Sequence, residues 1–457
     1  MPAERTDRLL LAALLLLNLA LKCSWLGVNV LFNDEPFTVY WSQQPWSALW
    51  PMLAAENNPP LYFLLIKVWS WITPFEAAWL RVPAAVFSAL VVWPLYLLAQ
   101  RLSRRRTAIL AALLFTFNNY HYGYAHEVRA YALFTVLTVT SLWLLVRAKD
   151  LPANVLRALF GLSALNTVLV YTHFFGWLVI GLEFLLVFTL PELRHLRRKF
   201  TVGVGITLLC FTPYLRLFFH RIGQSVGKGT WLEPPVAEEL YNMLWRWSNQ
   251  PVLVILFVAL IVAAAWKDKL RSLASRFALL WSVVPLFGMF LISFVVPMFL
   301  DRYLVFAAPG FALAVAISAD TLLPKHRIGH LMASVPVLGM LFTFTPWKPS
   351  VRQPAHLAEQ VRDWCGEGCE LIVVPAWYWL NYLAVEDLDQ LRKDQNAKLN
   401  GADRKTAPPS VDPVVVVDAS GDLTDLDRSW RWEMSSTLPV VDSTQADHKV
   451  WVYRFSR

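Results

Sequence analysis

Long apolar stretches alternate with short basic clusters along most of the chain. A transmembrane helix needs about 20 consecutive apolar residues, and the pattern predicts eleven spans, near residues 9–30, 80–99, 107–119, 130–146, 153–171, 174–190, 200–218, 251–266, 277–298, 303–321 and 328–346. The stretch 59–72 is also apolar, but it has 14 residues and contains Lys67, so we expect an interfacial helix on the outer membrane face. Residues 1–346 are therefore predicted to form an all-α polytopic membrane domain with a long first outer loop, 31–79.

The basic clusters between these spans set the predicted orientation. Short loops rich in Lys and Arg stay on the cytoplasmic side of a membrane, and the clusters here are RLSRRR (101–106), RAK (147–149), RHLRRK (194–199), KDKLRSLASR (267–276) and KHR (325–327). Eleven spans place all five clusters inside, with a cytoplasmic N-terminus and a retained N-terminal anchor. Counting 59–72 as a span would move the first cluster outside.

Residues 347–457 differ in pattern and predict a separate small α/β domain on the outer side. The stretch 356–365 has a helical pattern, and the runs ELIVVPAW, DPVVVVDAS and KVWVYRF are typical of strands. Cys365 and Cys369 could form a local disulfide in an oxidising compartment, and two free thiols are the alternative. The stretch offers too few ligands for a zinc site.

Composition favours a membrane protein and argues against a nucleic-acid-binding one. Hydrophobic residues make up 56% of the 457 residues, and charged residues make up 16%. The net charge of +8 resides largely in the clusters between spans, as in the cytoplasmic loops of multispanning proteins. We therefore expect the lipid bilayer, and no nucleic acid, among the partners.

Two adjacent carboxylates, Asp34 and Glu35, follow the first predicted span in the segment FNDEPFTVYW. Solvated charges at a helix end are the simplest explanation. Aromatic neighbours and the low charge of the surrounding loop favour a functional role, because an apolar wall can tune the proton affinity of a carboxylate for base catalysis.

Two other outer segments carry an arginine beside a span, although basic residues otherwise concentrate inside. Glu127 and Arg129 lie just before the span at 130–146, and Arg302 and Tyr303 lie in DRYL at the start of a later span. Arg129 could simply extend to the membrane surface and pair with Glu127. Alternatively, the two guanidinium groups bind an anionic lipid head group.

The ordered set of segments NDEPFTVYW, NNPPLYFLLIKVW, LRVPAAVFSALVVWPLYLLAQRL, YAHEVRAYALFTVLTVTSLWLL, LVYTHFFGW and DRYLVFAAPGFALA resembles bacterial membrane glycosyltransferases of the GT-C class. The most similar groups are the protein O-mannosyltransferase-like proteins and, more distantly, the aminoarabinose transferase that acts on lipid A. The resemblance covers nearly the whole chain, and its specificity lies in the ordered set rather than in one motif. It implies a GT-C fold and sugar transfer from a polyprenyl-phosphate donor to an acceptor hydroxyl.

The resemblance also implies roles for individual residues. Asp34 matches the acidic residue of the first outer loop that acts on the acceptor, with Glu35 beside it. Glu127 and Arg129 match a short outer motif that ends in a carboxylate and an arginine before a span. Arg302 and Tyr303 match the arginine-tyrosine pair of the late outer loop.

One departure from the family concerns the two residues before Pro59 and Pro60. Relatives often carry His or Lys immediately before these prolines, whereas this chain has Asn57 and Asn58. We expect Asn58 to lie in the donor site, and Tyr62 is a candidate wall residue of the same pocket. The cation for the donor phosphate would then come from Arg129, Arg302 or Lys67, or the donor is held differently.

Elementary chemistry agrees with this assignment. Sugar transfer from a phosphate leaving group needs a base for the acceptor proton and positive charge for the departing phosphate. Asp34 would be the base, and Arg129 and Arg302 would stabilise the phosphate. Displacement in one step predicts inversion at the sugar carbon, with Glu35 as the remaining candidate for a second nucleophile.

Metal dependence stays open at the level of sequence. Asp34, Glu35 and Glu56 could hold a divalent ion with open coordination positions. His121 and His126 have aromatic neighbours and are expected to be interfacial hydrogen-bonding residues rather than metal ligands.

A lipid or glycan transporter, or flippase, is the alternative from another class. Such proteins carry ionisable groups near the membrane midplane and often contain internal repeats. Here Glu183 is the clearest midspan charge, and the two halves show no repeat. The transferase hypothesis predicts a bacterial cytoplasmic-membrane enzyme with a polyprenyl-phosphate sugar as donor and a glycan, lipid or protein as acceptor.

Overall fold

The computed structural model describes most of the chain, and it divides the protein into two compact units. The described residues are 2–55, 58–150, 155–228, 232–324, 326–347, 354–366, 368–374, 378–393, 412–419, 439–447 and 450–456. Unit 1 comprises residues 1–24, 51–62 and 81–346, and unit 2 comprises residues 25–50, 63–80 and 347–457. The chain passes between the units five times, and three of these passages lie inside helices, namely α3 (Trp46–Ala55), α4 (Leu61–Ile72) and α5 (Ala77–Leu90).

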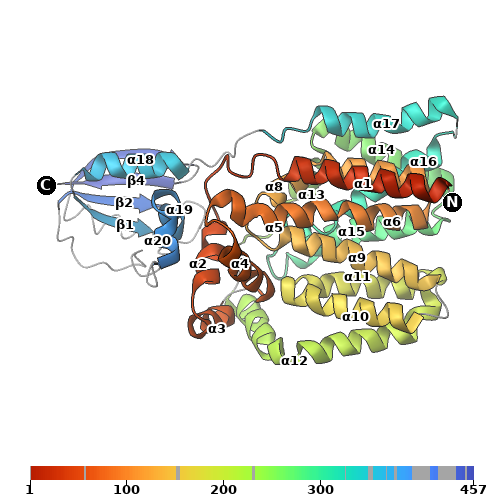
Figure 1. Cartoon of the computed structure of the whole chain (residues 1–457), viewed down its shortest axis with the longest axis horizontal. Helices are drawn as coiled ribbons and strands as arrows, with labels where there is room; N and C mark the ends of the chain where they lie inside the picture. Colours follow the sequence, from red (N-terminus) through yellow and green to blue (C-terminus); the bar gives the residue numbers. More distant parts are fainter. Residues whose placement is uncertain are drawn as a thin grey trace. The chain divides into compact units, whose positions relative to one another are not determined.

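Unit 1 is a bundle of apolar helices that lie roughly alongside one another (Figure 1). Its long helices are α1 (Pro2–Lys22), α6 (Val92–Leu102), α7 (Arg105–Thr116), α9 (Tyr131–Lys149), α10 (Val155–Thr172), α11 (Gly176–Thr189), α12 (Arg197–Lys228), α14 (Pro251–Asp268), α15 (Leu273–Ile292), α16 (Ala308–Leu322) and α17 (Arg327–Phe342). Every predicted span coincides with one of these helices or, at 80–99, with α5 and α6. The break between α5 and α6 precedes Pro94, which has no N–H to donate to a carbonyl one turn earlier.

The apolar character of these helices makes unit 1 a membrane domain. Among the described residues, five helical stretches are long and apolar enough to cross a membrane by themselves, namely Ala77–Leu102, Tyr131–Lys149, Pro191–Gly223, Pro251–Asp268 and Leu273–Ile292. Shorter apolar helices cover Leu61–Ile72, Leu156–Thr172, Gly176–Thr189, Ala308–Leu322 and Arg327–Phe342. The predicted all-α membrane domain is confirmed.

The structure differs from the prediction in three regions. Helix α1 ends at Lys22 rather than near residue 30, and Trp25 just beyond it has a left-handed backbone with φ of 60°. The segment 219–250, which lies between the predicted spans at 200–218 and 251–266, is largely helical, because α12 continues to Lys228 and α13 (Glu238–Ser248) follows. The first outer loop also contains helices, α2 (Glu35–Gln43), α3 and α4. The helix expected at 59–72 is confirmed as α4, whereas the sequence pattern missed α2, α3 and α13 because short helices carry no long apolar run.

The C-terminal part of unit 2 is the predicted small α/β domain. It contains α18 (Pro354–Cys365), α19 (Trp379–Glu386), α20 (Leu388–Lys393) and the strands β1 (Glu370–Val374), β2 (Val414–Asp418), β3 (Val440–Asp447) and β4 (Val450–Phe455). The strand order is β1-β2-β4-β3, with β1 and β2 parallel and the other pairs antiparallel. The three predicted strands are confirmed. Strand β3 was missed because its segment, VVDSTQAD, is mostly polar.

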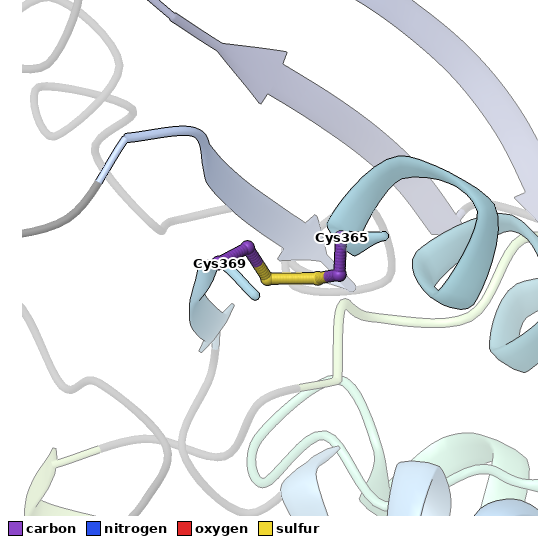
Figure 2. The surroundings of a disulfide bond; sticks show 2 residues. All are labelled: Cys365 and Cys369. Carbon is purple, nitrogen blue, oxygen red and sulfur yellow. A yellow bond between two sulfur atoms is a disulfide. The ribbon is translucent and has the colours of Figure 1, made fainter. Parts of the chain in front are cut away.

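One face of this sheet packs against α18. Leu357 and Val361 of α18 share a buried cluster with Val373, Val415 and Val452 of the strands. At the C-terminal end of α18, Cys365 and Cys369 form a disulfide across the turn into β1 (Figure 2). The other two cysteines, Cys23 and Cys210, are free thiols.

Candidate functional site

Arg129 stands at the junction of the short helix α8 (Asn119–Ala125) and the long helix α9. Its Nη2 donates a hydrogen bond of 3.1 Å to Oδ1 of Asn58. Its guanidinium carbon lies 5.8 Å from the ring centroid of Tyr131, a cation–π distance. Asn58 therefore supplies an acceptor that orients Arg129, whereas the His or Lys of the relatives would supply a cation.

Arg302 lies in the short 3-10 helix η3 (Asp301–Leu304), before α16. Its guanidinium carbon is 5.7 Å from the ring centroid of Tyr303, and its backbone N–H donates to Oδ1 of Asp301 over 2.7 Å. The other carboxylate oxygen of Asp301 accepts from Nε of Arg246 over 3.1 Å. The Asp301 carboxylate thus spans from Arg246 to the η3 backbone and fixes the turn that presents Arg302.

His173 connects the two arginine positions. It lies in the turn between α10 and α11, and its ring centroid is 6.1 Å from both the Tyr131 ring and the Tyr303 ring. The ring stacks on Phe134 at 4.8 Å with an interplanar angle of 22°. Burial, and then the positive charges of Arg129 and Arg302, lower the pKa of His173 to about 3. Two guanidinium groups that were predicted from separate outer segments therefore share one neutral imidazole as a neighbour.

Two other predicted donor-site residues lie in unit 1. Tyr62 is buried, with 3% of its surface exposed. Glu127 is half-buried, and its backbone carbonyl accepts the N–H of Arg129 over 2.7 Å, so the two are joined through the main chain.

Lys67, a candidate cation for the donor phosphate, lies in unit 2. Its Nζ donates to the backbone carbonyls of Ser42 and Gln44, over 3.2 and 2.7 Å, at the C-terminal end of α2. Unpaired carbonyls at a helix end carry partial negative charge, so a lysine there stabilises the helix. The structure gives Lys67 the role of a cap on α2.

Asp34 and Glu35 lie in unit 2, at the start of α2. Asp34 occupies the N-cap position and is half-buried, while Glu35 has 1% of its surface exposed. Oε2 of Glu35 accepts the backbone N–H of Phe32 over 3.2 Å. Acidic residues and Pro36 in the first turn match the preferences of a helix N-terminus. Asp34 is therefore the more accessible carboxylate of the pair.

No group of three His, Cys, Asp or Glu residues that could hold a metal ion gathers within the described part of the chain. Glu56, one of the three carboxylates considered for a divalent ion, lies outside the described residues. His121 and His126 hold other contacts. The backbone N–H of His121 donates to Oδ1 of Asn118 over 2.9 Å. Nε2 of His126 lies 3.0 Å from the carbonyl oxygen of Lys22.

Sequence reasoning missed three residues that organise this end of unit 1: His173, Arg246 and Asn249. Asn249 has a left-handed backbone, with φ of 63°. Its Nδ2 donates to the carbonyl of Phe117 over 2.8 Å, and its Oδ1 accepts the N–H of Asn119 over 2.9 Å. The sequence did hold one indication for His173 and Arg246, because the predicted topology places both on the same outer side of the membrane as Arg129 and Arg302.

Comparison with known proteins supports the same class of fold. A family model described as dolichyl-phosphate-mannose-protein mannosyltransferase matches residues 57–216. The crystal structure of ArnT from Cupriavidus metallidurans bound to undecaprenyl phosphate aligns with a TM-score of 0.62 and 14% identity, over 98% of each chain. The fold is that of a GT-C glycosyltransferase.

A second GT-C structure is similar over most of the chain. The archaeal oligosaccharyltransferase AglB from Archaeoglobus fulgidus, in complex with an inhibitory peptide and a dolichol-phosphate, aligns with a TM-score of 0.56 and 12% identity. The alignment covers 91% of this chain and 70% of that chain. Among proteins with curated functions, no sequence matches this chain. The GT-C fold predicted from the ordered segments is thus confirmed at the level of structure.

Proposed function

We propose that this protein is a membrane glycosyltransferase that moves a sugar from a polyprenyl-phosphate donor to an acceptor hydroxyl. The observation that carries the proposal is that Arg129 and Arg302 each lie against a tyrosine ring, and that both tyrosine rings are 6.1 Å from the ring of His173. Two guanidinium groups at one site suit a phosphate, which they can bind with several charge-assisted hydrogen bonds. The ArnT and AglB structures, which hold a polyprenyl phosphate and a dolichol-phosphate, support this donor class.

The arginines would act mainly in the transition state. A phosphate diester that links a lipid to a sugar carries one negative charge, and the leaving lipid phosphate carries up to about two. Positive charge that is fixed in place before reaction stabilises the growing charge and so lowers the barrier. Asn58 holds Arg129, and Asp301 fixes the turn that carries Arg302, so neither guanidinium would need to reorganise.

Asp34 would be the base. It takes the proton of the acceptor hydroxyl as the acceptor oxygen bonds to the anomeric carbon and the bond from that carbon to the phosphate oxygen breaks. The products are a glycoside of inverted configuration, the lipid phosphate and protonated Asp34. Glu35 is the less suitable base because it is buried and accepts a hydrogen bond from the Phe32 backbone.

The proposed setting is the bacterial cytoplasmic membrane, with the N-terminus inside and the site on the outer face. The distribution of basic clusters between spans supports this orientation. A glycan, a lipid or a protein is the acceptor. The family match and both structural relatives are transferases, and the transporter alternative gains no support from them.

The decisive experiment follows the consumption of an undecaprenyl-phosphate-linked sugar by the detergent-purified protein. We expect Asp34→Asn to abolish transfer while donor binding and the thermal midpoint stay near the wild-type values, because Asn keeps the shape and loses the base. Transfer by Asp34→Asn at the wild-type rate would exclude Asp34 as the base.

Arg302→Ala should behave differently from Asp34→Asn. Loss of a charge-assisted contact to phosphate costs about 1.5–3 kcal/mol, so donor binding should weaken about 10- to 100-fold. Arg246→Ala, which removes the ion-pair partner of Asp301, serves as the control and should have the smaller effect. Equal donor affinity in Arg302→Ala and wild type would remove Arg302 from the phosphate site.

A further inference from the structure

His173 is held in one orientation by three features of the chain. Its ring stacks on Phe134, its Nδ1 accepts the backbone N–H of Phe175 over 3.1 Å, and the turn closes at Gly176. A Cβ at Gly176 would lie 3.0 Å from backbone atoms of Leu169 and Val170. The turn from α10 to α11 is therefore tight, and the imidazole has little freedom to rotate.

The hydrogen bond to Phe175 fixes the tautomer. Because Nδ1 accepts a proton donor, the ring proton of the neutral imidazole resides on Nε2. The two neighbouring arginines oppose protonation of the ring, so this tautomer persists at neutral pH. Nε2 is consequently a permanent N–H donor and cannot act as a base.

The Nε2–H group is available to a ligand. None of the residues that the structure describes forms a hydrogen bond with Nε2, and the ring is only half-buried. A donor near two guanidinium groups meets an anion rather than a cation, because both positive charges attract the same partner.

We propose that His173 donates a hydrogen bond from Nε2 to the lipid-linked phosphate that Arg129 and Arg302 bind. This inference rests on the proposed function and adds a third, uncharged donor to its phosphate site. A neutral donor adds a contact to the phosphate without the repulsion that a third cation beside two arginines would introduce. It also defines the position of the phosphate, since an imidazole N–H points in one direction while a guanidinium offers several.

The alternative is a purely structural His173 that only caps the turn through Nδ1. Two amide side chains separate these roles, because Asn places a polar atom near the position of Nδ1, whereas Gln reaches the position of Nε2. His173→Asn therefore keeps an acceptor for Phe175 and loses the distal donor. His173→Gln keeps a distal N–H donor and loses the proximal acceptor, and His173→Phe keeps only a stacking ring.

The test measures equilibrium binding of undecaprenyl phosphate to the full-length, detergent-purified protein, with the thermal midpoint as a check of folding. We expect His173→Gln to bind within about threefold of wild type, and His173→Asn and His173→Phe to bind about tenfold or more weakly. The assignment of Nε2 would be overturned by wild-type affinity in His173→Asn with weak binding in His173→Gln, or by wild-type affinity in all three variants. Equal losses in all three variants would also overturn it, since they indicate that the ring is needed only for the turn.

Failure of the proposed function looks different from failure of this inference. A wild-type protein that binds no undecaprenyl phosphate contradicts the phosphate site as a whole. Wild-type binding that every His173 variant retains leaves the arginine site in place and removes only His173 from it.

Discussion

At the scale of single residues, the pairing of Asn58 with Arg129 explains how this chain departs from its relatives. The two residues are separated by 71 positions in the sequence and joined by a hydrogen bond of 3.1 Å. A cation at position 58 would repel Arg129, whereas an amide oxygen holds it. In the proposed site, the departure therefore changes which residue supplies positive charge to the phosphate and leaves the charge itself in place.

This pairing is tested by two variants of Asn58, one that removes the hydrogen-bond acceptor and one that keeps it but adds a negative charge. Asn58→Ala removes the acceptor and frees Arg129 to reorient, so donor binding should weaken several-fold, about the effect of one hydrogen bond to a charged group. Asn58→Asp keeps an acceptor but adds a negative charge that competes with phosphate for Arg129, so binding should weaken further, by about tenfold or more. Both variants are compared by undecaprenyl phosphate binding at low and high salt. Tighter binding in Asn58→Asp than in Asn58→Ala would contradict the role of Asn58 as a neutral holder of Arg129.

The sequence selected Arg129, Arg302 and Asp34 as candidate site residues but could not reveal how they are held. Residue type and membrane side were enough to select them, because an arginine on the outer side stands out against the inner basic clusters. Their neighbours come from distant segments, so no local pattern could indicate them. Lys67 shows the converse, because its charge suggested a phosphate contact and only the structure reveals the α2 carbonyls as its partners.

At the scale of helices, the turn between α10 and α11 controls the position of His173. Gly176 begins α11 where that helix comes close to the end of α10. Gly181 lies in the same helix, and a Cβ there would meet no described atom within 4 Å. The two glycines therefore form a matched pair for testing the turn.

We expect Gly176→Ala to destabilise the protein by about 1–3 kcal/mol, because the new methyl group presses on backbone atoms that cannot rotate away. Gly181→Ala should be neutral or stabilising by up to about 1 kcal/mol, since alanine is the better helix former. Thermal unfolding of both variants in the same detergent provides the comparison. Equal thermal midpoints for the two variants would show that the close contact of Gly176 with the backbone of Leu169 and Val170 does not exclude a side chain.

The helices that could be predicted from the sequence are those that a long apolar run specifies by itself. Long apolar runs bounded by basic clusters have one stable arrangement in a bilayer, and all eleven predicted spans are helical. Helices α2 and α13 are short and amphipathic, so their stability depends on tertiary packing that the local pattern does not contain. Strand β3 pairs with β4 at the edge of the sheet, where polar residues are common and the alternating signal is weak.

At the scale of the whole molecule, two half-buried histidines couple stability to pH. Burial, followed by the charges of Lys22 and Arg81, lowers the pKa of His126 to about 4 from an ordinary 6.5, even though its hydrogen bond to the Lys22 carbonyl favours protonation. The pKa of His173 is lowered to about 3. Both rings are neutral in the folded protein and become charged in the unfolded chain below its pKa of 6.5.

The sign of the effect follows from proton uptake. Between pH 6.5 and 4 the unfolded chain binds more protons than the folded one, so the free energy of unfolding falls as the pH falls. The thermal midpoint should therefore decrease over this range. His126→Gln retains a side-chain donor for the Lys22 carbonyl and cannot titrate, so its midpoint should decrease less steeply. Parallel pH profiles for His126→Gln and wild type would exclude His126 as a source of the acid sensitivity.

The division of the chain into two units has a consequence for protein engineering. The α2 helix that carries Asp34 and Glu35 belongs to the same unit as residues 347–457, and α19 and α20 pack against it. The passages between the units at 50/51, 62/63 and 80/81 fall inside α3, α4 and α5 rather than in linkers. Chimeras that exchange only residues 347–457 with those of a relative would leave α2 against a foreign surface, so a working exchange must transplant residues 25–50 and 63–80 as well.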